Sequence, residues 1–283
     1  MECKEKFCIV IPVYSVELSP IDKIGLEKLY KVLGYKKYPT KFVCPKGLDL
    51  TNYRKIYPNF DIEEFDTKWF KGIYEYSQLC LQYEFYDRFS NYEYMFMYQL
   101  DSYIWEDRIE EICNMGYDYI GGPVFSGLSK WDLINKDTGK YEPKVGNGGC
   151  GWRKIETFKD ICNPEGEFRK TYNITDEILA NVVIEDKYFS NDIERKYDLY
   201  KPSYQKALSI VWDMSVPEIY DKWGYKKLPM CAHALYKYPT FWKDKVEEFN
   251  NDEIQKYCID KIKKHLISSK QLHDKHQNMI KNK

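Results

Sequence analysis

Tyr94-Met95-Phe96-Met97-Tyr98-Gln99-Leu100 is an apolar run that stops at Asp101. A short, continuous apolar run of this kind is typical of a strand that is buried on both faces of a sheet. Asp101 is therefore expected at the carboxyl end of a central strand. In open α/β sheets, ligands bind at this end of the strands.

Further short apolar runs occur on both sides of this strand, and helical spacing separates most of them. We predict strands at 7–12, 41–44, 60–65 and 117–120, the last one ending at Gly121-Gly122-Pro123. We predict helices from Ser19-Pro20 to Gly34, around 79–86, from Glu106 to Gly116, and around 155–161. This alternation predicts an α/β, Rossmann-like fold with a mostly parallel central sheet and helices on both faces.

The segments after the central strands are less regular. Residues 125–145 are polar and are expected to form a loop over the site, which the glycine cluster at 146–151 would close. Ile254, Cys258, Ile262 and Leu266 recur every four residues, which predicts a C-terminal helix with a frayed end after Ser268. We expect one domain over 1–242 and a C-terminal helix with a polar tail over 243–283.

Composition excludes several classes of protein. The 43 basic and 44 acidic residues give a net charge of −1, so no global field attracts nucleic acid or an anionic membrane. The sequence has no transmembrane segment and no apolar leader, and its nine scattered cysteines resemble buried free thiols. We expect a cytoplasmic protein whose contact with membranes is at most peripheral.

Asp101 is the strongest candidate for binding a charged ligand. Asp101-Ser102-Tyr103 stands where an Asp-x-Asp signature would hold a divalent cation and a diphosphate, but the second Asp is replaced by Tyr. Taken alone, an Asp before a predicted helix is more often a helix cap than a ligand. Its place after a central strand favours the ligand-binding interpretation.

Further chain segments supply an acidic pair and a histidine. Glu185 or Asp186 could deprotonate an acceptor hydroxyl, although acidic pairs are also common on helix ends. Three of the four histidines lie in the polar tail, so only His233 is expected at a folded site. His233 and Lys237 could both address a metal-diphosphate, or His233 could be a buried histidine with a structural role.

Four motifs together resemble a known family: Tyr98-Gln99-Leu100-Asp101-Ser102, Tyr117-Asp118-Tyr119-Ile120-Gly121, Gly146-Asn147-Gly148-Gly149 and Cys231-Ala232-His233. The chain is similar over residues 7–242 to a bacterial family of glycosyltransferase-like proteins that is catalogued as a domain of unknown function. That family is expected to have a GT-A fold. The resemblance implies a nucleotide-sugar donor and a glycan or lipid-linked acceptor, as in surface polysaccharide or glycoconjugate synthesis.

The resemblance also implies roles for particular residues. Asp186, or next Glu185, would be the base of an inverting transfer, while Asp101 and His233 would hold a divalent cation, Mn²⁺ or Mg²⁺. The residues expected to contact the donor are Val13, Tyr14, Ser15, Gln99, Asp101, Ser102, Gly148, Gly149 and Lys237. The missing second Asp at Tyr103 departs from the family pattern and puts the metal in question.

Two other classes of function compete with a glycosyltransferase. A nucleotidyltransferase uses a related sheet, but the loop after its first strand is normally glycine-rich and basic, unlike Pro12-Val13-Tyr14-Ser15. A non-catalytic nucleotide- or sugar-binding module would fit the solitary Asp101 and the 27 tyrosines, whose rings suit sugar stacking. No protease triad, HExxH motif or P-loop is present.

Overall fold

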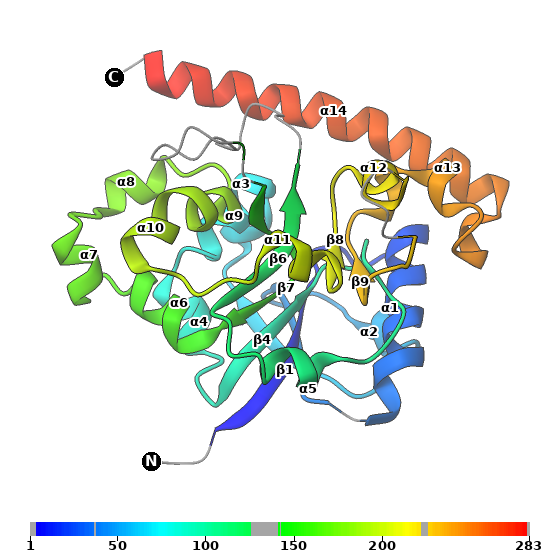
Figure 1. The fold of residues 1–283 in the computed structure, drawn as a ribbon, viewed down its shortest axis with the longest axis horizontal. Helices are drawn as coiled ribbons and strands as arrows, with labels where there is room; N and C mark the ends of the chain where they lie inside the picture. The colour runs from blue at the N-terminus through cyan, green and yellow to red at the C-terminus, as the bar shows by residue number, and fades with distance from the viewer. Residues whose placement is uncertain (1–3, 37, 126–140, 142, 222–225, 282–283) are drawn as a thin grey trace.

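The molecule is built on a six-stranded sheet with the strand order β3-β2-β1-β4-β7-β6 (Figure 1). The computed structural model describes residues 4–36, 38–125, 141, 143–221 and 226–281. The strands of this sheet are β1 (Glu5–Pro12), β2 (Thr40–Pro45), β3 (Asp61–Phe65), β4 (Tyr92–Tyr98), β6 (Tyr119–Val124) and β7 (Lys144–Lys154). Most of the predicted loop at 125–145 lies outside the described residues.

Pairing in the sheet is mostly parallel. Strand β1 runs parallel to β2 and to β4, and β2 runs parallel to β3. Strand β7 is antiparallel to both of its neighbours, β4 and β6. The predicted mostly parallel α/β sheet is therefore confirmed, with β4 and its Asp101 in the middle.

Helices cover both faces of the sheet. One face carries α1 (Pro20–Leu33), α2 (Thr51–Arg54) and α5 (Ile109–Cys113). The other carries α3 (Ile73–Leu79), α4 (Tyr83–Asp87), α6 (Ile155–Cys162), α7 (Glu167–Thr171), α8 (Asp176–Ala180), α9 (Glu185–Lys187), the π-helix η3 (Tyr188–Ile193) and α10 (Glu194–Tyr197). Short 3-10 turns are η1 (Gly34–Lys36), η2 (Thr67–Phe70), η4 (Leu235–Lys237) and η5 (Glu247–Phe249).

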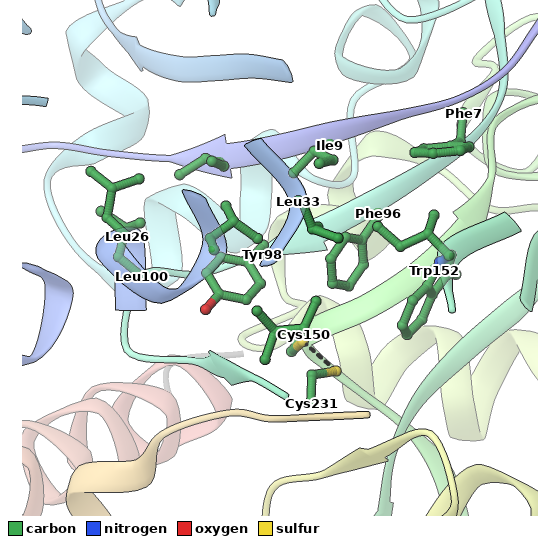
Figure 2. Close-up of a cluster of buried hydrophobic side chains, with 14 of the residues drawn as sticks. Phe7, Ile9, Leu26, Leu33, Phe96, Tyr98, Leu100, Cys150, Trp152 and Cys231 are labelled. Carbon is green, nitrogen blue, oxygen red and sulfur yellow. Dashed lines mark hydrogen bonds between the residues drawn. The ribbon is translucent and has the colours of Figure 1, made fainter. Parts of the chain in front are cut away.

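The alternation of side chains along β1 explains the two-sided core. Phe7 and Ile9 pack with Leu26 and Leu33 of α1 in the first core (Figure 2). Residues Cys8 and Val10, which point the other way along the same strand, belong to the second core with helices α4 and α6. A strand that is buried on both faces needs an unbroken apolar run, as the sequence of β1 has.

A small second sheet lies beside the large one and carries a third core. Its strands are β5 (Tyr103–Ile104), β9 (Cys231–Ala232) and β8 (Val211–Trp212), in that order. The helices of this region are α11 (Tyr204–Leu208), α12 (Val216–Asp221), α13 (Pro239–Trp242) and α14 (Asp252–Lys281). The thiol of Cys150 in β7 contacts Cys231 in β9 at 2.8 Å and so joins the two sheets (Figure 2).

Helix α14 runs along one side of the molecule, past α12 and α13 (Figure 1). Cys258 of α14 is fully buried in the third core, as the four-residue spacing predicts. That core also contains Trp242 and Val246, so it crosses the predicted domain boundary, which itself stays a prediction. No described helix combines the length and the apolar composition needed to cross a bilayer.

Several predicted element boundaries are wrong. The helix expected from Glu106 begins only at Ile109, after β5 and a short connection in which the Asp107 carboxylate accepts from the Ile109 N–H at 3.2 Å. Strand β6 continues through Gly121-Gly122-Pro123 to Val124, with bulges at these positions. The backbone of α14 is helical to Lys281, beyond the fraying expected after Ser268. The predicted helix around 79–86 is two helices, α3 and α4.

The glycine cluster at 146–151 is also misassigned, because it lies inside β7 rather than in a loop. An added Cβ at Gly151 would overlap the Ile120 carbonyl oxygen, and one at Gly121 would lie 2.6 Å from the Asn147 carbonyl oxygen. Glycine is needed here because β6 and β7 approach each other so closely.

Candidate functional site

Three polar residues, Asp101, Asp213 and His233, lie together at one end of the strands of the small sheet. Asp101 precedes β5, in which Tyr103 pairs with Ala232 of β9. His233 follows β9, and Asp213 follows the parallel strand β8. The backbone N–H of His233 donates to the Trp212 carbonyl at 2.8 Å and fixes this register. Residues far apart in sequence are thereby placed side by side.

The turn that carries Asp101 is held rigidly by its neighbours. The N–H of Ser102 donates to the Gln99 carbonyl at 3.0 Å. The buried Tyr98 hydroxyl lies 2.9 Å from the Ser102 carbonyl and 3.1 Å from the Gly25 carbonyl of α1. A Cβ at Gly25 would overlap the Leu100 carbonyl oxygen, so only glycine lets α1 approach this turn.

Five charged side chains form what we call the Asp101 cluster: Asp101, Asp213, His233, Lys237 and Lys261. The His233 ring lies between the two carboxylates, with Nε2 3.1 Å from Asp101 Oδ1 and Nδ1 against Asp213 Oδ2. Lys237 Nζ is 3.2 Å from Asp213 Oδ1, and Lys261 Nζ is 3.4 Å from Asp101 Oδ2. Asp213 is completely buried, whereas the others keep 12–26% of their side-chain surface exposed.

The charges of the cluster shift one another's pKa values. Burial alone would lower the pKa of His233, but the Asp213 and Asp101 carboxylates raise it to about 10. Burial opposes ionisation of Asp101 as well, yet His233 and Lys261 hold its pKa well below the usual range. Lys237 and His233 overcome burial in the same way and lower the pKa of Asp213 to about 2. The ligand-free cluster is therefore an ion network with a protonated ring at its centre.

This arrangement does not fit a metal ion. Asp101 and His233 are brought together as predicted, but they contact each other rather than facing a shared open position. A metal-bound imidazole needs an unprotonated nitrogen, and both ring nitrogens here face carboxylates. Among the described residues, no group of three or more His, Cys, Asp or Glu side chains is arranged to hold a metal ion.

A second set of charged groups, which we call the Asp186 cluster, consists of Tyr119, Arg153, Glu185 and Asp186. Asp186 accepts hydrogen bonds from the Tyr119 hydroxyl at 2.8 Å, from Arg153 at 3.1 Å and from the Gly148 N–H at 2.9 Å. Glu185 accepts from Ser77 at 2.6 Å and pairs with Arg153 at 3.4 Å. Burial and the Glu185 charge raise the pKa of Asp186 to about 7, against the opposing charge of Arg153.

Strand β7 separates the two clusters. Successive residues of a strand point to opposite faces, and Gly148 and Gly149 are neighbours in β7. A Cβ at Gly148 would overlap Asp186, and one at Gly149 would overlap the His233 ring. Each cluster therefore packs against the glycine backbone of β7, which has no side chains at these two positions. Asp186 is therefore not brought into contact with Asp101.

We expect Gly149→Ala to displace the His233 ring and to destabilise the protein by about 1–3 kcal/mol, as overpacking of a filled site does. Urea denaturation measures this loss. Gly72→Ala is the matched control, because its backbone is extended and its Cβ would meet only the flexible end of Glu75. Equal stability of the two variants would contradict the tight fit around Gly149.

Some of the other residues that were predicted to contact the donor lie near the Asp101 cluster. Gln99 donates its N–H to the Gly149 carbonyl at 2.8 Å, which links β4 to the glycine pair. Val13 and Ser102 are buried, whereas Tyr14 is 62% exposed. The carbonyl of Ser15 accepts from Tyr53 at 2.7 Å. Of these side chains, those of Tyr14 and Ser15 are exposed and accessible to a ligand.

Four residues of the clusters were not predicted as site residues: Asp213, Arg153, Lys261 and Tyr119, of which Tyr119 stood only in a motif of the family resemblance. Ile210-Val211-Trp212-Asp213 carries the same signal as the run before Asp101, a short apolar stretch that ends in a carboxylate. Arg153 and Lys261 had no such signal. The assignment of His265 to a polar tail outside the folded site is wrong, since its ring packs against Tyr236 at 6.1 Å between centroids.

The sheet and the placement of Asp101 define an α/β protein with a GT-A-like fold. Mouse xyloside xylosyltransferase 1 in its apo form shares this fold, with a TM-score of 0.51 and 9% identity over 81% of this chain and 97% of that one. The chain itself belongs to the family described as "Protein of unknown function (DUF5672)", whose model matches residues 59–233.

Two fungal structures are similar at lower scores. Core-mannan synthase A from Aspergillus fumigatus, in an Mn/GDP form, has a TM-score of 0.47 and 10% identity over 70% of each chain. The mannosyltransferase Ktr4p from S. cerevisiae, in complex with GDP, has a TM-score of 0.47 and 7% identity over 72% of this chain and 68% of that one. No curated protein sequence matches the chain.

Proposed function

We propose that this chain is a glycosyltransferase that moves a sugar from a nucleoside-diphosphate donor to an acceptor hydroxyl. The observation that carries the proposal is the Asp101 cluster, which stands at the carboxyl end of the central strand β4 of a GT-A-like sheet. Ligands of open α/β sheets bind at this position, and a diphosphate needs charged partners there.

The wider setting of the proposal is synthesis of surface polysaccharide or of another glycoconjugate in the cytosol, with a glycan or lipid-linked acceptor. Eight free, buried cysteines among the described residues are consistent with a reducing compartment. The resemblance of the sequence motifs supports the substrate class.

The proposed reaction is a single displacement with inversion. The acceptor oxygen forms a bond to the anomeric carbon, while the bond from that carbon to the diphosphate oxygen breaks. The bonding electron pair leaves with the nucleoside diphosphate, and the acceptor proton goes to Asp186. Charged groups near Asp101 stabilise the departing diphosphate, whose negative charge grows as the bond breaks.

Asp186 is the proposed base because its raised pKa, about 7, suits proton uptake near neutral pH. Its carboxylate keeps 14% of its side-chain surface exposed. The backbone of Gly148 approaches Asp186 and that of Gly149 approaches the His233 ring, so this glycine pair of β7 lies between the two clusters. An acceptor hydroxyl would have to reach Asp186 beside this bare stretch of β7. Glu185 is the less accessible of the pair, at 7%.

The test combines binding and turnover in matched variants. We expect Asp186→Asn to keep donor binding but to lower the transfer rate about 100- to 10,000-fold, as loss of a general base does. Asp101→Asn is expected to weaken donor binding about tenfold or more, because it releases His233 and Lys261. Calorimetry and a nucleoside-diphosphate release assay over a panel of nucleotide sugars measure both effects.

Asp61→Asn is the control, since Asp61 is 74% exposed and pairs with Lys41 on the edge strand β3, away from both clusters. Failure of every nucleotide and nucleotide sugar to bind would refute the proposal. Binding without any transfer, in the presence of acceptors that other glycosyltransferases use, would favour the non-catalytic binding module instead.

A further inference from the structure

Helix α14 contributes a lysine to the candidate site. Lys261 Nζ lies 3.4 Å from Asp101 Oδ2 and 4.3 Å from the centroid of the Tyr236 ring. One turn later, His265 packs against the same ring. Tyr236 belongs to η4, which also carries Lys237. The helix therefore docks directly on the segment that supplies the other lysine of the Asp101 cluster.

The carboxylate oxygens of the cluster are already engaged. Asp101 faces His233 with one oxygen and Lys261 with the other, and Asp213 faces His233 and Lys237 in the same way. A divalent cation needs such oxygens as ligands. Tyr103, at the position of the absent second carboxylate, is buried and donates to Glu248 at 3.2 Å, away from the cluster.

Lys237 and Lys261, in contrast, have N–H donors that the carboxylates do not use. Each ammonium group has three N–H donors, and among the described residues each spends one on a carboxylate. Lys237 and Lys261 keep 25% and 26% of their side chains exposed, while Asp213 is fully buried. Both lysines therefore combine a partly exposed side chain with N–H donors that the carboxylates leave free.

The charge balance of the cluster does not single out a cation as its ligand. The two positive charges of Lys237 and Lys261 equal the two negative charges of Asp101 and Asp213, before any charge on His233 is counted. Asp22, in the first turn of α1, adds one carboxylate that interacts with Lys261 and Asp101. Two ammonium groups and the His233 ring thus face three carboxylates, which leaves little uncompensated negative charge to concentrate a divalent cation.

We propose that the site binds the diphosphate of the donor without a metal ion, with Lys237 and Lys261 as the groups that neutralise it. This inference rests on the proposed function and names the residues that neutralise the diphosphate in place of a metal ion. Asp101 and Asp213 act as positioning residues, because they hold the two ammonium groups in place. Helix α14 is then part of the donor site.

The experiment measures binding of inorganic pyrophosphate and of UDP, GDP, CDP, ADP and dTDP to the full chain in EDTA and in Mn²⁺. We expect binding in EDTA that Mn²⁺ does not tighten. Lys261→Met and Lys237→Met should each weaken diphosphate binding about 10- to 100-fold, the effect of losing a charged hydrogen bond. Binding of the matching nucleosides should change little.

Lys263→Met is the matched control, because Lys263 lies on the same helix, is 69% exposed and pairs with Asp260 at the surface. Lys261→Arg keeps the charge and should restore most of the affinity, which separates a loss of charge from a loss of packing. Diphosphate binding that requires Mn²⁺, or that is unchanged in both lysine variants, would overturn the inference while leaving the proposed function standing. No binding of any diphosphate would overturn both.

Discussion

Replacing Arg153 with methionine is expected to lower the free energy of unfolding by about 3–5 kcal/mol at pH 8, and by clearly less at pH 5. The Arg153 side chain is 2% exposed and contacts Glu185 at 3.4 Å, Asp186 at 3.1 Å and the Tyr86 hydroxyl at 2.8 Å. Removing the guanidinium leaves two buried carboxylates facing each other without a cation.

The pH dependence of this loss has a definite sign. The folded-state pKa of Asp186 is about 7, far above its ordinary value, and removal of Arg153 raises it further because Arg153 opposes the shift. A raised pKa means that the folded state gains stability from the bound proton at low pH and loses it as the pH rises through that pKa. The variant should therefore recover stability on acidification.

Urea denaturation at pH 5, 6, 7 and 8 measures the effect. Arg88→Met is the control, since Arg88 is 32% exposed and pairs with Glu84 on the same helical turn, and its loss should be about 1 kcal/mol or less. A loss for Arg153→Met that does not vary with pH would show that packing, not charge, is what Arg153 contributes.

The large sheet could be predicted because its strands carry strong local signals. The apolar run before Asp101 is a buried strand, and Ser19-Pro20 starts α1, with the Ser19 hydroxyl accepting from the Asp22 N–H at 3.2 Å. Strand β7 could not be predicted from its letters, since glycine weakens strands. Its glycines are required instead by neighbours from other segments, His233 and Asp186.

The candidate site was predictable only in part for a related reason. Strands β5, β8 and β9 are two residues long, too short for any periodic pattern. These strands nevertheless decide which residues meet Asp101. Asp101 was predicted from its place after the central strand and His233 as the histidine outside the tail, and the resemblance implied that they share a cation. Asp213 follows instead from strand pairing and Lys261 from the docking of α14. The apolar run before Asp213 marks the end of a strand, but the pairing of that strand and the docking of Lys261 leave no local mark in the sequence.

Asp213→Asn is expected to destabilise the protein by about 3–5 kcal/mol near neutral pH, with the opposite pH dependence to Arg153→Met. Asp213 is fully buried and faces His233 and Lys237. An amide of the same size keeps the packing but leaves these two cations without their shared counter-charge. Its N–H₂ group would also point a donor at one of them.

The sign of the pH dependence follows from His233. Its folded-state pKa is about 10, above its ordinary value of 6.5, so its contribution to stability is fully present below pH 6.5 and is lost as the pH rises through about 10. Asparagine removes the carboxylate that does most to raise this pKa. The difference in stability between wild type and variant should therefore be large at pH 6.5 and should shrink towards pH 10.

Two measurements check this prediction. Urea denaturation at pH 6.5, 8 and 9.5 gives the stability difference, and NMR titration of the His233 ring should show its pKa falling by several units in the variant. Asp260→Asn is the control, because Asp260 is 53% exposed and pairs with Lys263 at the surface. A ring that still titrates near pH 10 in Asp213→Asn would mean that Asp101 alone holds its proton. The ion network would then be centred on Asp101 and not on the buried carboxylate.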